Sequence, residues 1–194
     1  MKNLKDIEEE FVAQIHIPVT KPRKIIYVCP VGLIGAGKTT IIKPISEKLN
    51  LVRISSDELR KLLIENGHNY DSVKSIGLRV LENFVKNGYS VALDMDCGNT
   101  EVISFVKYLE KTYGGKSIWV HVVAPEEFIF NKFKNHEPSW LANNPQIMID
   151  NYIAQREKRL KENTEFNFTH TFDTSKDNIP KQINLFLEKI DPTS

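Results

Sequence analysis

The sequence predicts an α/β fold, in which a mostly parallel five-stranded sheet carries helices on both faces. Short apolar segments alternate along the chain with amphipathic segments of helical length. The stretches that separate successive apolar segments are long enough for crossover connections, which parallel strands require. An apolar segment, a glycine-rich turn and a helical pattern also follow one another within residues 24–42. This succession places a binding loop at the carboxyl end of a strand.

The composition is that of a soluble globular protein, and 194 residues suit one domain. A net charge of +1 gives no strong overall field to recruit nucleic acid or a membrane. Cys29 and Cys97 lack the spacing of a disulfide framework or a zinc site. We therefore expect both to act as small apolar residues of a cytosolic protein. The apolar runs are too short to span a membrane and the N-terminus is too charged for a signal peptide, so we expect a cytoplasmic protein.

The first predicted helix, residues 3–15, has apolar side chains on one side: Leu4, Ile7, Phe11 and Ile15. Pro18 and Pro22 then break the pattern and lead into the first strand, residues 24–29, which is rich in β-branched side chains. We therefore expect an N-terminal helix and linker at residues 1–22 and the main domain at residues 23–194.

The next elements are a helix that ends near Leu49 and a second strand at residues 51–54. Another helix opens at Ser55, whose distance in sequence from Glu58 fits a capping box, and it ends at residues 66–67. A longer amphipathic helix, residues 72–86, stops at an Asn-Gly pair. The third strand follows at residues 89–96.

The second half of the chain continues this alternation. A helix capped by Asn99 or Thr100 precedes a fourth strand at residues 117–123, and Pro125 begins a helix with acids in its first turn. A loop at residues 135–145 separates that helix from a longer one at residues 145–161. The last two elements are a fifth strand at residues 168–172 and a helix at residues 179–190.

Residues 32–39 fit the pattern Gly-x-x-x-x-Gly-Lys-Thr of a phosphate-binding loop. Glycines let the backbone approach phosphates closely, and the N–H groups and dipole of the following helix favour an anion. Lys38 can reach the terminal phosphates, and the Thr39 hydroxyl can bind a magnesium ion. The residues expected to hold the nucleotide are Gly32, Gly35, Ala36, Gly37, Lys38, Thr39 and Thr40.

Three acids follow predicted strands and should meet this loop at the carboxyl edge of the sheet. Asp57 follows the second strand and is our candidate general base, which would accept the proton of a substrate hydroxyl. Asp94 ends the third strand and is expected to share a metal ion with Thr39. Asp96 lies on the same side of that strand, so it competes for the metal role and is otherwise expected to bind substrate.

Two arginines are candidates for anion binding. Arg60 lies one helical turn after Asp57 and can neutralise it or hold an anionic acceptor, although a solvated surface role is the alternative. Arg156 falls within the apolar arc of the helix at residues 145–161, defined by Ile149, Tyr152, Ile153 and Leu160. An inward arginine needs a partner, so we expect Arg156 to act in catalysis on a bound phosphate, unless its stem packs and its guanidinium reaches solvent.

On these residues the chain resembles the small P-loop kinases, especially the polynucleotide-kinase-like and zeta-toxin-like group. The resemblance is carried by the loop, the segment Ser55-Ser56-Asp57-Glu58-Leu59-Arg60, residues 88–94 and Asp173-Thr174-Ser175. It implies ATP, Mg²⁺, a three-layer fold with strand order 2-3-1-4-5, and a helical lid at about residues 130–160. It also implies that Asp57 activates the acceptor hydroxyl and that Arg60 holds the acceptor. The lid arginines of the family are lysines here, Lys132 and Lys134.

We therefore expect an ATP-dependent kinase that transfers the γ-phosphate to a hydroxyl of a small metabolite or nucleotide-like acceptor. A polynucleotide 5′-hydroxyl kinase is an alternative, less favoured because no basic groove or aromatic series marks a nucleic-acid track. A nucleotide-binding regulatory module with little or no kinase activity is a second alternative. That module would need no general base, so Asp57 separates the two classes. The oligomeric state is left open.

Overall fold

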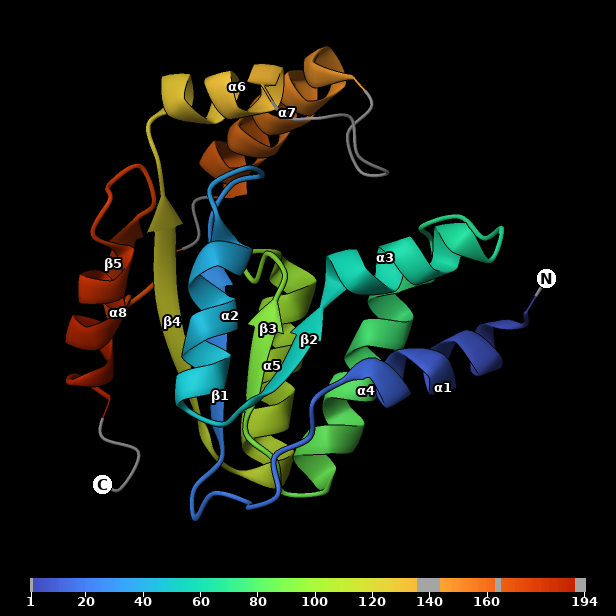
Figure 1. The fold of residues 1–194 in the computed structure, drawn as a ribbon. Helices are drawn as coiled ribbons and strands as arrows, with labels where there is room; N and C mark the ends of the chain where they lie inside the picture. The colour runs from blue at the N-terminus through green and yellow to red at the C-terminus, as the bar shows by residue number, and fades with distance from the viewer. Residues whose placement is uncertain (1, 136–143, 163–164, 191–194) are drawn as a thin grey trace.

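The computed structural model describes residues 2–135, 144–162 and 165–190 of the chain (Figure 1). Within these ranges, five strands form one parallel sheet in the order β2-β3-β1-β4-β5. The strands are β1 Ile26–Val31, β2 Val52–Ser55, β3 Val91–Asp94, β4 Lys116–Val123 and β5 His170–Asp173. The predicted fold class and strand order are confirmed.

The helices lie close to their predicted positions. They are α1 Leu4–Gln14, α2 Lys38–Lys48, α3 Ser56–Glu65, α4 Val73–Lys86, α5 Thr100–Tyr113, α6 Glu126–Asn135, α7 Pro145–Glu162 and α8 Ile179–Leu187. The fifth strand begins two residues later than the sequence indicated. Phe166 and Phe168 instead pack their rings beside Trp119 and His121 of β4, so the apolar run enters the sheet only at His170.

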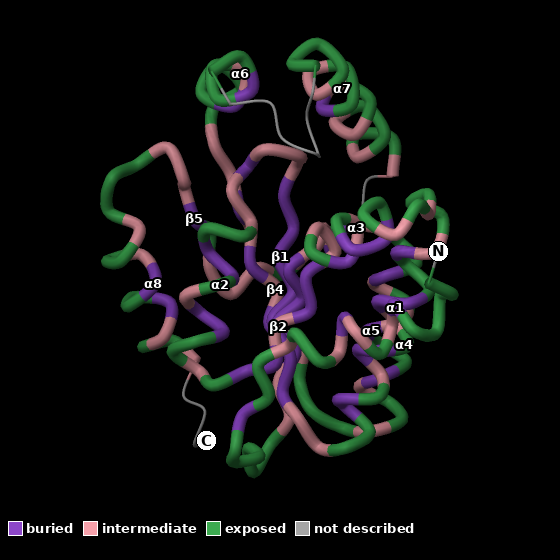
Figure 2. The backbone as a smooth tube through the Cα atoms, turned by 45° about the vertical axis from the view of Figure 1, so that its right-hand side comes forward, coloured by how far each residue is buried: buried purple, intermediate pink, exposed green. Residues whose placement is uncertain are grey.

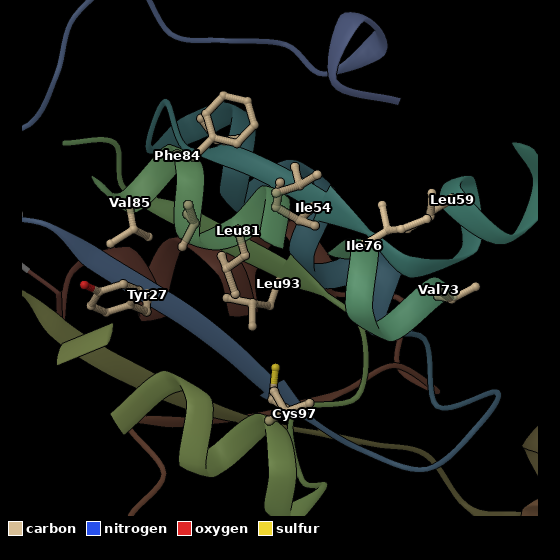
Figure 3. Close-up of a cluster of buried hydrophobic side chains, with 14 of the residues drawn as sticks. Tyr27, Ile54, Leu59, Val73, Ile76, Leu81, Phe84, Val85, Leu93 and Cys97 are labelled. Atoms are coloured by element: carbon tan, nitrogen blue, oxygen red, sulfur yellow. The ribbon is translucent and has the colours of Figure 1, made fainter. Parts of the chain in front are cut away.

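Side chains alternate along β1 and build a core on each face of the sheet. Tyr27, Cys29 and Val31 belong to the core formed with α1, α3, α4 and α5, part of which Figure 3 shows. Val28 belongs to the second core, which α2, α8 and strand β4 complete. Figure 2 shows the buried strands in the middle of the molecule, with helices outside them. Helices on both faces of a parallel sheet make the predicted three layers.

Helix α1 is attached to the first core. Its Ile7 and Phe11 are fully buried in the cluster that contains α3 and α4. Arg79 of α4 forms an ion pair with Glu8 and reinforces this contact at the surface. The N-terminal segment therefore covers one side of the helical layer next to β2.

Helices α6 and α7 lie together beyond the carboxyl ends of the strands, above the loop that joins β1 to α2 (Figure 1). Their buried residues Ile129, Phe133 and Tyr152 belong to the second core. The two helices occupy most of the predicted lid at about residues 130–160, of which residues 136–143 lie outside the described part. None of the helices in the described ranges combines the length and apolar character needed to cross a membrane.

Candidate functional site

The glycines of the phosphate-binding loop are required by its backbone shape and by its neighbours. Gly35 and Gly37 have φ values of 78° and 87°, in the left-handed region that side chains rarely adopt. At Gly32, a Cβ atom would lie 2.4 Å from the carbonyl oxygen of Val122, so β4 passes too close for any larger residue. Glycine at these three positions lets the backbone curl closely enough to surround a phosphate.

The side chains of Thr174 and Lys38 hold the loop in place. The Thr174 hydroxyl, which follows β5, donates to the Ala36 carbonyl at 2.7 Å. The Lys38 ammonium donates to the Gly32 and Leu33 carbonyls at 2.9 and 3.0 Å. Burial lowers the pKa of Lys38, and the carboxylates of the site act in the opposite direction. The lysine is therefore held against the loop, next to the N-terminus of α2.

Asp94 lies directly behind the loop and links it to strand β2. Its Oδ1 accepts a hydrogen bond from the Thr39 hydroxyl at 2.8 Å, and its Oδ2 accepts from Arg53 Nη1 at 2.5 Å. The Asp94 side chain is only 2% exposed, and burial raises its pKa, while the Thr39 hydrogen bond and the Arg53 charge lower it. Arg53 also pairs with Glu58 of α3. A chain of contacts thus runs from the loop to α3.

A cleft of about 490 Å³ opens over these groups and brings most of the predicted site residues together. Of the sequence candidates, it is lined by Gly35, Gly37, Lys38, Thr39, Thr40, Asp57, Arg60, Asp94 and Asp96. Gly32 and Ala36 are buried behind it, with their carbonyls bonded as described above. Asp57 lies in the first turn of α3 and forms an ion pair of 2.7 Å with Arg60. The acids after β2 and β3 therefore do face the loop.

Asp96 connects the loop to helix α7. Its carboxylate pairs with Arg159 and accepts from Gln155 Nε2 at 2.9 Å, while Gln155 Oε1 accepts from the Ile34 N–H at 2.7 Å. At Gly98 a Cβ atom would lie 1.6 Å from Arg159 Nη1, so this glycine makes room for the guanidinium. The cluster of Asp96, Gln155 and Arg159 is called the α7 latch below.

Arg156 is not among the residues that line the cleft. Its guanidinium pairs with Glu126 of α6. The predicted apolar arc was wrong at Leu160, which is 75% exposed. The side of α7 that turns inward instead carries Tyr152, Gln155 and Arg159, which recur at helical spacing. The expected catalytic role of Arg156 remains a prediction.

Sequence reasoning missed Arg53 and Gln155. Arg53 occupies a strand position whose pairing with Asp94 depends on β2 and β3 being neighbours. Gln155 carries no charge and matched no motif, although its spacing from Arg159 places both on one helix face. Thr174 belongs to the Asp173-Thr174-Ser175 segment that carries the family resemblance. Its contact with the loop became visible only in the structure.

The donor atoms at the loop fit a magnesium ion that is shared with bound phosphates. Mg²⁺ prefers oxygen ligands, keeps several waters and takes few ligands from the protein. Thr39 and Asp94 supply a hydroxyl and a carboxylate beside the N-terminus of α2. Within the described residues, no group of three or more His, Cys, Asp or Glu side chains forms a metal cage. The site can thus bind phosphates, help to hold Mg²⁺ and present a carboxylate to a hydroxyl.

No family model and no curated protein matches the sequence. Solved structures match its fold. An APS kinase from Mycobacterium tuberculosis, in complex with AMPPNP and APS, is 16% identical with a TM-score of 0.53, covering 87% of this chain and 98% of that one. A shikimate kinase from Bacteroides thetaiotaomicron is 17% identical with a TM-score of 0.55, covering 84% and 95%. A gluconokinase from Sinorhizobium meliloti 1021 is 15% identical with a TM-score of 0.54, covering 88% and 93%. The chain has the fold of these P-loop kinases.

Proposed function

We propose that the chain is an ATP-dependent phosphotransferase that moves the γ-phosphoryl group of ATP to a hydroxyl of a small molecule. The observation that carries this proposal is the cleft in which the loop, the Thr39–Asp94 pair and Asp57 meet. The three kinases named above, whose fold the chain shares, support a small acceptor, since two of them are named for shikimate and gluconate. A cytoplasmic location, which gives access to ATP, is part of the proposal.

The loop side of the cleft would hold the donor. Backbone N–H groups of the loop and of the first turn of α2 would bind the phosphates, with Lys38 as the cation beside them. Thr39 and Asp94 would hold Mg²⁺, which would neutralise charge on the phosphate oxygens. Asp94 is kept in position by Arg53 and the Thr39 hydroxyl, so its carboxylate needs little reorganisation on binding.

The acceptor would enter from the side of α3. In the transfer, the acceptor oxygen forms a bond to the γ-phosphorus as its proton passes to the Asp57 carboxylate. The bond between the γ-phosphorus and the bridging oxygen breaks, and its electron pair leaves with ADP. Arg60, paired with Asp57, would hold that carboxylate toward the acceptor.

Two arginines of α7 are candidates for stabilising the transferred group. Arg159 does not line the cleft itself, but its partner Asp96 does, so the guanidinium would reach a phosphate there by exchanging this carboxylate for it. Arg156 pairs instead with Glu126, which does not line the cleft. We assign the phosphate contact to Arg159 and keep Arg156 as the second candidate. Membership of the polynucleotide-kinase-like and zeta-toxin-like group is a further, narrower part of the proposal.

Transfer of labelled phosphate tests the proposal. The protein is incubated with Mg²⁺ and ATP labelled in the γ-phosphate, together with small hydroxy compounds and 5′-hydroxyl oligonucleotides. We expect label in at least one small compound, and none with Lys38→Ala. Label in the oligonucleotides alone would favour a polynucleotide kinase. ATP binding without label in any acceptor would favour the regulatory module.

A further inference from the structure

A second cavity, of about 400 Å³, adjoins the cleft on the side away from the loop. It lies among the end of β2, helices α3, α4 and α5, and the segment after β3. The two spaces are neighbours because they share five lining residues, Ser56, Arg60, Met95, Asp96 and Gln155. A molecule in this cavity would lie next to Arg60, the ion-pair partner of Asp57, at the boundary with the cleft.

The wall formed by α4 is hollowed at Gly77, in the interior of the helix. A Cβ atom added there would meet Leu59 Cδ2 and Met95 Cε at 4.0 Å each, which is ordinary contact. Neither crowding nor a positive φ therefore requires the glycine. Glycine is nevertheless destabilising in a helix interior relative to alanine. The hollow adjoins an apolar surface to which Leu59 and Val73 contribute (Figure 3), and Met95 can adapt its shape to an occupant.

Three of the four charged side chains that line the cavity form ion pairs with residues outside its lining. Arg60 pairs with Asp57, and Lys74 pairs with Glu101. Asp96 pairs with Arg159 of α7. An anionic acceptor would have to compete with these carboxylates for Arg60 and Lys74, so the cavity offers it no unshared positive charge. The carboxylate of Asp71, which also lines the cavity, would repel it further.

Polar atoms and an aromatic ring are available for an uncharged occupant. Tyr70 lines the cavity and is 49% exposed, so its ring can cover a flat ligand. The Asn99 side chain also lines the space and can exchange hydrogen bonds with hydroxyl groups. An apolar wall with a few polar groups is typical of small-molecule sites.

We propose that this cavity is the acceptor site and that it takes an uncharged ring compound with several hydroxyl groups, of the sugar, cyclitol or nucleoside class, whose flat face packs in the hollow at Gly77. This inference rests on the proposed function in calling the ligand a phosphate acceptor. The binding itself can be measured without phosphate transfer. Gly77 is then the residue that sets the depth of the site.

The test measures binding of matched probes with saturating AMPPNP and Mg²⁺ to fill the donor site. The pairs are glucose and glucuronate, methyl shikimate and shikimate, and cytidine and cytidine 3′-phosphate. We expect the uncharged member of at least one pair to bind about tenfold more tightly than its charged partner. Gly77→Val should weaken that binding about tenfold or more, and Gly77→Ala should weaken it less. AMPPNP affinity should not change.

Two controls separate a filled cavity from a damaged fold. Ser75→Val places the same side chain on α4 at an exposed position that does not line the cavity, and it should leave probe binding intact. Gly77→Ala should have a thermal midpoint at least equal to that of the wild type, because alanine favours the helix.

The inference is overturned if the charged partners bind better, if Gly77→Val binds as the wild type does, or if no uncharged probe binds. Failure of the proposed function looks different. If an uncharged probe binds, Gly77→Val prevents it and no phosphate is transferred, then the site stands and the kinase proposal fails. If phosphate passes only to a charged probe, then the kinase proposal stands and this inference fails.

Discussion

The Thr39 hydroxyl donates a hydrogen bond to Asp94 Oδ1 at 2.8 Å, although the two residues are 55 positions apart in the sequence. The contact joins the first turn of α2 to the end of β3, and Arg53 binds the other carboxylate oxygen. The proposed metal site is therefore positioned by helix α2 and by strands β2 and β3. Its parts come together only through the strand order β2-β3-β1.

Thr39→Val should impair the metal site and leave the fold intact, because valine keeps the shape of threonine and removes the oxygen. Loss of an oriented group at a metal site costs roughly 10- to 100-fold in metal affinity or activity. We expect the Mg²⁺ concentration for half-maximal transfer to rise by that factor, measured in a titration of the rate with Mg²⁺. Thr39→Ser, which keeps the hydroxyl, should stay close to the wild type. Equal Mg²⁺ dependence in all three proteins would contradict the assignment.

Arg53→Leu should destabilise the protein, because it leaves the buried Asp94 carboxylate without its cation. Removing one partner of a buried ion pair costs about 3–5 kcal/mol. Urea unfolding at pH 7 measures the loss, and Arg53→Lys should restore part of it. In the double variant with Asp94→Asn the loss should be smaller than the sum of the single losses, since the two side chains interact. Additive losses would show that the pair is energetically unimportant.

Gly98→Ala should open the α7 latch. The new methyl group would occupy the position of the Arg159 guanidinium, which can swing away because it ends a flexible side chain. Amide hydrogen exchange in α7 and at Ile34 should then become faster, while exchange in the sheet stays slow. Gly77→Ala is the matched control, because its methyl group fits its surroundings. Unchanged exchange in α7 would mean that the α7 latch contributes nothing to holding the helix against the loop.

His121 should make stability depend on pH. Burial lowers its pKa in the folded protein, the Arg159 charge adds to this, and the ring stacks on Phe168 at 4.6 Å. Because the folded pKa lies below the unfolded value of about 6.5, the unfolded state takes up the proton first. Stability present above about pH 6.5 is therefore lost as the pH falls through the folded pKa.

His121→Phe should reduce that acid-side loss, measured as the unfolding free energy at a series of pH values between 8 and 5. The pKa of His170 is lowered as well, by burial and by the charge of Lys189, so part of the pH dependence should remain. A variant whose pH dependence equals that of the wild type would exclude His121 as its source.

Features that depend on local spacing could be predicted from the sequence. The loop has a fixed pattern, Asp57 comes shortly after a predicted strand and Asp94 ends another, so their meeting at the carboxyl edge followed from parallel topology. The partner of Arg53 depends on which strands are neighbours, and that information is not local. The predicted apolar side of α7 was drawn partly through Leu160, which is exposed. Counting that leucine as buried shifted the predicted inward side of the helix toward Arg156.

Phosphoryl transfer by Asp57→Asn is the most direct test of the central claim, because asparagine keeps the size of the side chain and cannot take the acceptor proton. General-base catalysis contributes about 10²- to 10⁴-fold, so transfer to the preferred acceptor should fall by that factor, with ATP affinity unchanged. Lys38→Ala is the companion variant and should abolish transfer. Undiminished transfer by Asp57→Asn, together with none by Lys38→Ala, would contradict the account.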